Sequence, residues 1–202
     1  MTGRAWTGAF RLGLTGSIGM GKSTTAGFFA DHGLPVWDAD AAVHRLYAAG
    51  GPAAAVLAPE FPQAITAGAV DRAALKARIA ADPTALSRLE VLVHPLVSAD
   101  RAAFGTGTTA DIVIFDIPLL FEKATQSQMD ATLLVTAPAT LQRARVLARP
   151  GMTQAHFDTL LARQMPDAEK RSRATHIVET LSLDATRAYV AALIDHIRTS
   201  HA

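Results

Sequence analysis

One glycine-rich stretch has residue types and a spacing that suit phosphate chemistry. It reads Gly16-Ser17-Ile18-Gly19-Met20-Gly21-Lys22-Ser23 and fits the pattern GxxxxGK[ST] at every fixed position. Glycines let the backbone curl so that successive N–H groups point at phosphate oxygens, and the start of a helix adds partial positive charge. We expect Lys22 to lie along the β- and γ-phosphates, and Ser23 to offer its hydroxyl to Mg²⁺. The predicted nucleotide-binding residues are Gly16, Ser17, Ile18, Gly19, Met20, Gly21, Lys22, Ser23 and Thr24.

The segments on either side have the pattern that such a loop requires. Residues 10–15 form a short apolar segment that predicts a buried strand, and residues 24–32 predict a helix that Gly33 ends. Phe28 and Phe29 of this helix are available for a core. Strand, loop and helix therefore follow in the order that binding of a nucleoside triphosphate needs, which argues against a glycine turn that fits the pattern by chance.

Carboxylates stand where two further strands are expected to end. Residues 34–37 are a short apolar run that stops at Asp38 and Asp40, and residues 111–115 form a strand that stops at Asp116. In a parallel sheet such ends lie at the same edge as the phosphate loop. We favour Asp40 as the base that accepts a proton from an acceptor hydroxyl, with Asp38 supporting a Mg²⁺-bound water. A helix N-cap is the alternative for one of the pair. Asp116 has the position of a Walker-B-type carboxylate, and a plain turn aspartate is its alternative.

Basic residues gather in the region 139–173, which holds seven Arg or Lys and three acidic residues. We expect this region to be a lid. Arg145 and Arg149 are four residues apart and hence on one helix face, and the Pro150-Gly151 break supplies a hinge. An arginine brought over the γ-phosphate would neutralise developing charge and exclude water, which limits wasteful hydrolysis of ATP. The alternative is a solvated basic helix face.

The order of the predicted elements fits one domain of the α/β class. The 202 residues suffice for one such domain, and strands alternate with helices, which indicates a doubly wound sheet. The uninterrupted apolar run 131–136 predicts a parallel strand buried on both faces. Residues 50–104 predict helices and no strand of convincing length, so we expect an inserted helical lobe there. The last helix, 183–198, carries an apolar stripe made of Leu183, Thr186, Val190, Leu193, Ile194 and Ile197.

Composition leaves several classes of function without support. With no cysteine, the chain has no disulfide, thiolate metal site or thiol nucleophile. The net charge of +1 gives no argument for a nucleic-acid partner. No stretch reaches the roughly 20 apolar residues that cross a bilayer, and the N-terminus has no apolar signal core, so we expect no membrane partner and a cytoplasmic location. Nothing in the pattern specifies an oligomeric state.

Beyond these patterns, the sequence resembles the dephospho-coenzyme A kinase family over nearly its whole length. The resemblance rests on the phosphate loop, on Val36-Trp37-Asp38-Ala39-Asp40, on Leu92-Val93-His94-Pro95 and on Asp116-Ile117-Pro118-Leu119-Leu120-Phe121-Glu122. The last segment is the most discriminating, because other small-molecule kinases share the phosphate loop but not this sequence. Family-like spacings also hold for Gln142, Arg145, Arg149, Gln164, Met165, Pro166 and Lys170.

The resemblance implies ATP and Mg²⁺ as cofactors and phosphorylation of the ribose 3′-hydroxyl of dephospho-coenzyme A, the last step of coenzyme A synthesis. It implies a five-stranded parallel sheet with an inserted helical substrate lobe and a lid, as in nucleotide kinases. By the same resemblance Asp40 is the base, and Lys22 with Arg145 or Arg149 contacts the transferring phosphates. The residues implied to hold this small-molecule acceptor, or the loop beside it, are Asp38, Arg72, His94, Asp116, Pro118, Leu119, Leu120, Phe121 and Glu122.

Three positions depart from the family pattern. Near the C-terminus the family has an alanine-aspartate pair and then an asparagine that helps to seat the adenine. This chain has Ala174-Thr175 and Thr180 there, and Leu160 stands where an arginine is expected. These departures concern adenine binding and the charge of the lid, not the phosphoryl-transfer core.

Two other functions stay open at the level of sequence. Another nucleoside monophosphate or small-molecule kinase would differ in its acceptor, which the lobe selects. A nucleotide-dependent switch or assembly factor would bind ATP or GTP to change its affinity for a partner, although the chain has no Asn-Lys-x-Asp guanine signature.

Overall fold

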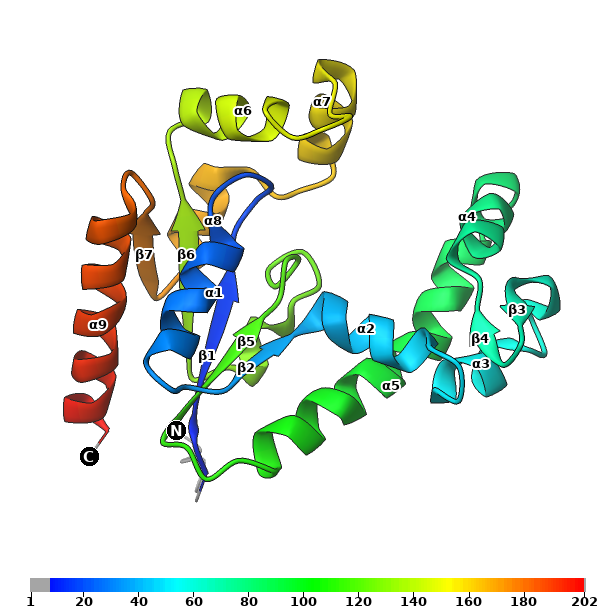
Figure 1. Ribbon diagram of the computed structural model, residues 1–202, viewed down its shortest axis with the longest axis horizontal. Coiled ribbons are helices and arrows are strands. Elements are labelled where there is room, and N and C mark those ends of the chain that lie inside the picture. The colour runs from blue at the N-terminus through cyan, green and yellow to red at the C-terminus, as the bar shows by residue number, and fades with distance from the viewer. Residues whose placement is uncertain (1–7, 202) are drawn as a thin grey trace. The chain divides into compact units, whose positions relative to one another are not determined.

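The computed structural model describes residues 8–201 and contains a five-stranded sheet (Figure 1). Its strands are β1 (Phe10–Thr15), β2 (Val36–Asp38), β5 (Ile112–Asp116), β6 (Ala131–Thr136) and β7 (His176–Glu179), in the spatial order β2-β5-β1-β6-β7. β1 pairs in parallel with β5 and β6, and β6 pairs in parallel with β7. The strand that leads into the phosphate loop is therefore central, and the predicted doubly wound parallel sheet is confirmed.

Helices connect these strands and cover the sheet. α1 (Lys22–Asp31) follows β1, α9 (Leu183–Ser200) follows β7, and the two helices pack together in one hydrophobic core with the sheet. α6 (Ala139–Leu147), α7 (Gln154–Ala162) and α8 (Asp167–Arg173) lie between β6 and β7 in the chain, and a short 3₁₀ helix, η2 (Thr125–Gln128), precedes β6. Every residue of β5 and β6 is buried, and for β6 this confirms the prediction made from its uninterrupted apolar run.

The first helix ends as its glycine predicts. Gly33 has a φ of +76°, its N–H donates to the Ala30 carbonyl at 2.8 Å, and the Leu34 N–H donates to the Phe29 carbonyl at 3.2 Å. Phe28 and Phe29 are both buried against the sheet. This helix end returns the chain to β2, so the same core that seats α1 also fixes the start of the phosphate loop.

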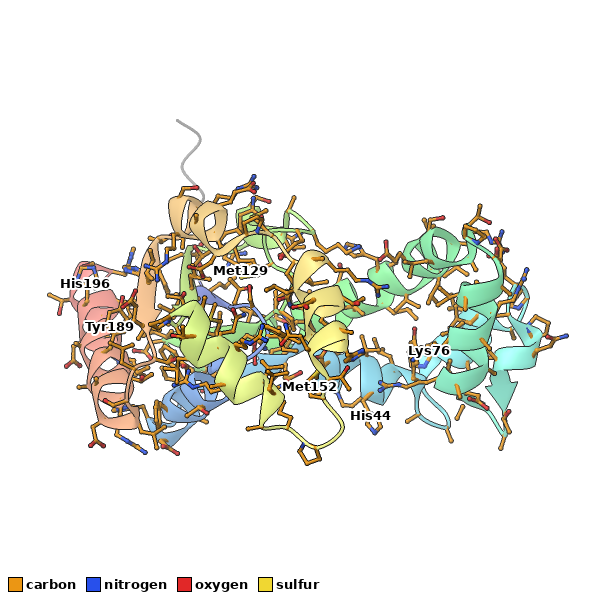
Figure 2. All side chains as sticks on the ribbon, turned by 90° about the horizontal axis from the view of Figure 1, so that it is seen from above. His44, Lys76, Met129, Met152, Tyr189 and His196 are labelled. Atoms are coloured by element: carbon orange, nitrogen blue, oxygen red, sulfur yellow. The ribbon has the colours of Figure 1, made fainter. Side chains whose placement is uncertain are left out.

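The C-terminal helix buries most of its predicted stripe. Thr186, Val190, Leu193, Ile194 and Ile197 are buried. Leu183 is 66% exposed, which contradicts the prediction, because it lies in the first turn and lines a cavity instead of the sheet. Further along α9, Tyr189 and His196 lie beside β7 (Figure 2).

Residues 38–107 form a second compact unit, separate from the unit that contains most of the sheet. Its elements are α2 (Ala39–Tyr47), α3 (Pro52–Leu57), the 3₁₀ helix η1 (Pro62–Ala64), β3 (Ile65–Thr66), β4 (Ala69–Val70), α4 (Arg72–Ala81) and α5 (Ala85–Thr106). Leu57 and Ala85 are fully buried in its own core. The predicted lobe over 50–104 falls inside this unit. The hairpin of β3 and β4 is an addition to the prediction, because strands of two residues carry no detectable period.

Among residues 8–201, no helix combines the length and apolar character that crossing a membrane requires.

Candidate active site

The phosphate loop connects β1 to α1, and its backbone requires glycine at two positions. Gly19 has a φ of +78° and Gly21 a φ of +94°, a region that other residues rarely adopt. Gly21 is also the N-cap residue of α1. A Cβ atom on Gly19 would lie 2.4 Å from Cγ2 of Val146. The loop can therefore close over the start of α1 only with these glycines in place.

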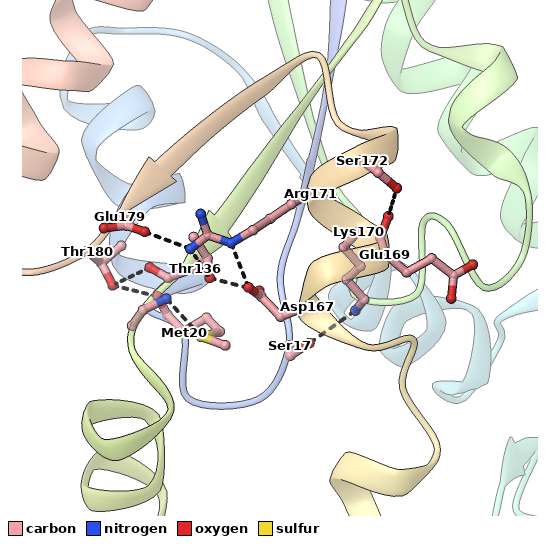
Figure 3. A network of polar contacts seen from close by, with 11 residues as sticks. Ser17, Met20, Thr136, Asp167, Glu169, Lys170, Arg171, Ser172, Glu179 and Thr180 are labelled. Atoms are coloured by element: carbon pink, nitrogen blue, oxygen red, sulfur yellow. Dashed lines mark hydrogen bonds and ion pairs between the residues drawn. The ribbon is translucent and has the colours of Figure 1, made fainter.

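Side chains from distant segments hold the loop by its backbone. Gln142 Nε2 donates to the Ile18 carbonyl at 2.8 Å, and Gln164 Oε1 accepts from the Ile18 N–H at 3.1 Å. Thr180 Oγ1 donates to the Met20 carbonyl at 2.7 Å (Figure 3). The conformation of the loop is thus set by the protein itself.

The start of α1 offers hydrogen-bond donors beside the loop. The first N–H groups of a helix have no hydrogen-bond partner within the helix. In α1 the Thr25 N–H donates to the Gly21 carbonyl, and the N–H groups before it are left for a ligand. Ser23 and Thr24 are exposed in this first turn. The amides of the turn and the positive end of the helix dipole together make a site suited to a phosphate group.

Lys22 and Asp116 form an ion pair next to the loop. Lys22 is the first residue of α1, and Asp116 is the last residue of β5. Their side chains are 16% and 3% exposed. The sheet therefore brings a cation and a buried carboxylate together where the motif and the strand end predict them.

A cavity of about 350 Å³ lies beside the phosphate loop. Arg145 and Arg149 both line it. Arg145 donates to Thr180 Oγ1 at 2.8 Å and to the Thr180 carbonyl at 2.6 Å, whereas Arg149 is exposed. The prediction that the two arginines share a helix face is wrong, because α6 ends at Leu147 and Arg149 lies in the turn that follows. They nevertheless belong to one site.

The segment after β5 is only partly open to the surface. Pro118 and Leu119 are half-buried, whereas Leu120 is 0% exposed and Phe121 is 2% exposed. Leu120 packs against Gly13 of β1, where an added Cβ atom would lie 3.1 Å from Leu120 Cδ2. The implied role of Leu120 and Phe121 in lining the acceptor is therefore corrected, because both belong to the core, whereas Pro118 and Leu119 keep part of their surface exposed.

Glu122 anchors this segment. Its Oε1 atom accepts from Lys170 Nζ at 2.9 Å and from the Met165 N–H at 2.8 Å. Burial by itself would raise the pKa of Glu122, but the donors from Lys170 and Met165 outweigh it and hold the pKa below its ordinary value. Glu122 is therefore a half-buried, ionised anchor at neutral pH.

The two aspartates that follow β2 have different surroundings. Asp38 is the N-cap residue of α2 and accepts from the Ala41 N–H at 2.8 Å. Asp40 is exposed in the first turn of the same helix. The sequence left open which of the two aspartates is a helix N-cap, and the structure shows that it is Asp38.

Two further predicted residues lie in the second unit. The Arg72 guanidinium lies 5.7 Å from the centre of the Tyr47 ring, and burial raises the pKa of Tyr47 although Arg72 opposes the shift. His94 is exposed on α5, and the helix continues through the Pro95 that follows it.

Two of the three departures from the family pattern, Thr175 and Thr180, have structural roles here. Thr180 ties the phosphate loop to Arg145, as described above. The Thr175 N–H donates to Thr132 Oγ1 at 3.0 Å, and the Thr132 N–H donates to Thr175 Oγ1 at 3.2 Å, which fastens the segment before β7 to β6. Leu160 is half-buried in α7.

Sequence reasoning missed the side-chain contacts that hold the loop. The contact of Thr180 carries no sequence signal, because its partner Met20 is 160 residues away. Gln142, Gln164 and Lys170, whose Nζ atom lies 3.2 Å from Ser17 Oγ, carry only their family-like spacing, which marks the positions but does not show that they contact the loop.

A phosphate loop between the central strand and the first helix of this sheet, with an arginine-lined cavity beside it, defines a P-loop kinase. The family model of dephospho-CoA kinase matches residues 10–184. The chain belongs to the dephospho-CoA kinase family, and the resemblance seen in its motifs is confirmed.

Relatives and solved structures agree with this assignment. The chain is 68% identical over 189 residues to a dephospho-CoA kinase from Cereibacter sphaeroides, a match that covers 94% of this chain and 96% of the relative. It is 53% identical over 192 residues to a dephospho-CoA kinase from Ruegeria pomeroyi, with 95% and 98% covered. A crystal structure from Thermus thermophilus is 37% identical, with a TM-score of 0.81 and 94% and 98% covered. A dephospho-CoA kinase structure from Campylobacter jejuni, 22% identical with a TM-score of 0.71 over 95% and 98% of the two chains, shares the fold.

Proposed function

We propose that this chain transfers the γ-phosphoryl group of ATP to the ribose 3′-hydroxyl of dephospho-coenzyme A, releasing ADP and coenzyme A. The observation that carries the proposal is the amide-lined start of α1 with Lys22 beside it, which fits a triphosphate. The choice of acceptor is supported by the high identity to dephospho-CoA kinases over nearly the full length.

On the donor side, the loop amides hold the phosphates, and Lys22 exchanges Asp116 for the β- and γ-phosphates. The cavity beside the loop takes the adenine. Its lining includes Leu181 and Leu183, which are 58% and 66% exposed and offer apolar surface to a planar base. Arg149, exposed at the same cavity, is the arginine available to approach the phosphates as the lid closes.

On the acceptor side, Asp40 accepts the proton of the 3′-hydroxyl. The bond between this oxygen and the γ-phosphorus forms as the bond from phosphorus to the β-phosphate oxygen breaks, and ADP leaves. Because such a transition state is loose, positioning and charge stabilisation matter more than the strength of the base. Asp38, Arg72, His94, Pro118 and Leu119 hold the acceptor.

We assign Mg²⁺ to the Ser23 hydroxyl, which is exposed in the first turn of α1 next to the ion pair of Lys22 and Asp116. Within residues 8–201 no group of three or more His, Cys, Asp or Glu side chains could hold a metal ion. We propose phosphate oxygens and water as its other ligands. When bound, the ion neutralises charge on the phosphates. We also propose a cytoplasmic location for the reaction.

The test is a coupled assay of ADP release with ATP and Mg²⁺, comparing dephospho-coenzyme A with AMP, a nucleoside and no acceptor, and identifying the product by mass. We expect ADP release that depends on dephospho-coenzyme A and a product with the mass of coenzyme A. Activity with another acceptor alone would retain the kinase and discard this substrate. Nucleotide hydrolysis that no acceptor accelerates would favour the switch or assembly factor.

A further inference from the structure

Lys170 is a charged side chain with no exposed surface, and no step of the proposed reaction uses it. Burial strips the hydration from an ammonium group, which is unfavourable unless a carboxylate and hydrogen bonds replace the water. Here the replacements are Glu122 Oε1 at 2.9 Å and Ser17 Oγ at 3.2 Å. Figure 3 shows the second contact, which reaches the phosphate loop from α8.

The helix that carries Lys170 is itself anchored at the strand ends (Figure 3). Asp167 accepts from Thr136 Oγ1 at 2.8 Å and from Arg171 Nε at 2.7 Å. Arg171 also donates to Glu179 at 2.7 Å. Because Thr136 ends β6 and Glu179 ends β7, α8 is fixed to two strands of the sheet and holds Lys170 at a defined place.

The segment from Gln164 to Lys170 contacts both sides of the site. Gln164 and Lys170 bind adjacent residues of the phosphate loop, Ile18 and Ser17. Lys170 also pairs with Glu122, which ends the segment that follows β5. One short stretch of chain therefore holds the nucleotide loop and the segment on the acceptor side.

We propose that Lys170 is a positioning residue that fixes the phosphate loop at Ser17 for nucleotide binding and couples it, through Glu122, to the segment that carries Pro118 and Leu119. The coupling to the acceptor segment rests on the proposed function, whereas the effect on nucleotide binding rests on the contact with the phosphate loop alone. Lys170 contacts no substrate in this role. Its loss weakens ATP binding more than it slows the chemical step.

The decisive comparison is Lys170→Met against the double variant Lys170→Met/Glu122→Gln. The single variant leaves the half-buried Glu122 carboxylate without its cation, whereas the double variant removes both charges. We expect both variants to raise the Kd of ATP by about tenfold or more, because Ser17 has lost a charged donor. The Kd is measured by titration calorimetry without an acceptor, and kcat should fall less than kcat/KM for ATP. If Lys170 serves only to neutralise Glu122, the double variant binds ATP as the wild type does, and the proposal is wrong.

The single variant also has a pH signature. Lys170 is the charged group that faces Glu122, and the Met165 amide is its other partner. Without the ammonium group, only backbone donors such as the Met165 amide oppose the effect of burial, so the pKa of Glu122 rises and its carboxylate ionises without a cation beside it. We expect the KM for ATP of Lys170→Met to increase as the pH is raised and that of the double variant to stay level. Parallel profiles for the two variants would contradict the coupling through Glu122.

Arg11→Met is the matched control. Arg11 forms an ion pair with Asp130 at 2.8 Å and its side chain is 11% exposed, but it lies near the start of β1, away from the phosphate loop. We expect this variant to lower the Tm and leave the Kd of ATP unchanged. An equal loss of ATP affinity in Arg11→Met would show a global effect and overturn the proposal.

Ser17→Ala covers the case in which the Lys170 variants do not fold. It removes the bond from Lys170 to the loop and keeps the pair of Lys170 and Glu122. We expect ATP to bind several-fold more weakly at an unchanged Tm, and unchanged affinity would overturn the proposal. Because no acceptor is present, failure of dephospho-coenzyme A as a substrate would leave these binding results intact.

Discussion

Lys22 and Asp116 show how the site holds its charges before a nucleotide binds. The Asp116 side chain is 3% exposed, and a carboxylate at that depth is stable as an ion only beside compensating groups. Lys22 supplies the cation from the first turn of α1. In the proposed function, phosphates compete with Asp116 for this ammonium group.

Removing this lysine tests the phosphate-binding role at the scale of one residue. We expect Lys22→Ala to abolish phosphoryl transfer, because it removes the charge over the β- and γ-phosphates. The Tm should fall as well, since Asp116 keeps its buried position and loses its lysine. ADP release and a thermal melt measure the two effects. Near-normal turnover would contradict the assignment of the phosphate loop.

Asp40 and Asp38 can be separated in the same way. Asp40→Asn keeps the shape of the side chain and removes its basicity, so we expect nearly unchanged ATP binding and a kcat lower by a factor on the order of 10² or more. Asp38→Asn should lower kcat less, because asparagine caps a helix about as well as aspartate and keeps the bond to the Ala41 N–H. Calorimetry and steady-state kinetics give both quantities.

The outcome assigns the two roles. Loss of ATP binding in Asp40→Asn equal to its loss of kcat would make Asp40 a metal-site or structural residue. A larger loss of kcat in Asp38→Asn than in Asp40→Asn would exchange the base and the cap.

At the scale of elements, contiguous patterns predicted the sheet well. β5 lies where a short apolar strand was expected, and β6 lies at an uninterrupted apolar run, because so hydrophobic a segment is stable only when both faces are covered. The end of α6 at Leu147 was not predicted. A four-residue spacing places two residues on one helix face only if the helix continues between them, and it does not indicate where the helix ends. For the same reason the pattern cannot tell that Leu120 faces Gly13 in the core while Leu119 stays half-buried.

The site was predictable to the extent that it is local. The loop motif spans adjacent residues, and Lys22 meets Asp116 because strand ends share an edge. The bonds from Lys170 to Ser17 and from Thr180 to Met20 span 153 and 160 residues. Such contacts depend on how α8 and β7 pack against the loop, which no local spacing encodes.

Gly19 in the phosphate loop and Gly27 in α1 allow a comparison of two glycine-to-alanine substitutions. Gly19→Ala places a Cβ 2.4 Å from Val146 Cγ2 at a φ of +78°, so the loop must distort, and we expect the Kd of ATP to rise by about tenfold or more. Gly27→Ala is the control, because nothing lies within 4 Å of its Cβ position inside α1. It should raise the free energy of unfolding by about 0.5–1 kcal/mol and leave ATP binding unchanged. Calorimetry and urea unfolding measure these effects, and normal ATP binding by Gly19→Ala would refute the strained-loop argument.

At the scale of the whole molecule, the chain is two compact units with separate cores. Phe29 and Leu133 belong to the core of the sheet unit, and Leu57 and Ala85 to that of residues 38–107. The first unit carries the phosphate loop and its cavity, and the second carries Asp40. The residues proposed to bind the phosphate donor thus belong to one unit, and the proposed base belongs to the other. In the sequence this division is visible only as a change from alternating strands and helices to helices alone.

Titratable groups in both units give the whole molecule a defined response to acid. Burial, together with His196 at 6.0 Å between ring centres, lowers the pKa of His176 below its ordinary value. Hydrogen bonds with Thr84 hold the pKa of Asp82 at about 2, and the pKa of Glu122 is also lowered. A pKa that is lower in the folded state means that the folded protein binds fewer protons than the unfolded chain. The stabilisation is therefore full above the unfolded pKa and is lost as the pH falls through the folded one.

We therefore expect acid to destabilise the protein in two steps. The free energy of unfolding in urea should begin to fall below about pH 6.5 as His176 becomes protonated, and should fall further below about pH 4.5 as the carboxylates follow. His176→Gln should abolish the first step and keep the second, whereas His156→Gln, a change at an exposed position of α7, should keep both. Urea unfolding between about pH 7.5 and about pH 3 measures these slopes. A first step that persists in His176→Gln would assign it to another group, and stability that rises on acidification would contradict the sign of every shift used here.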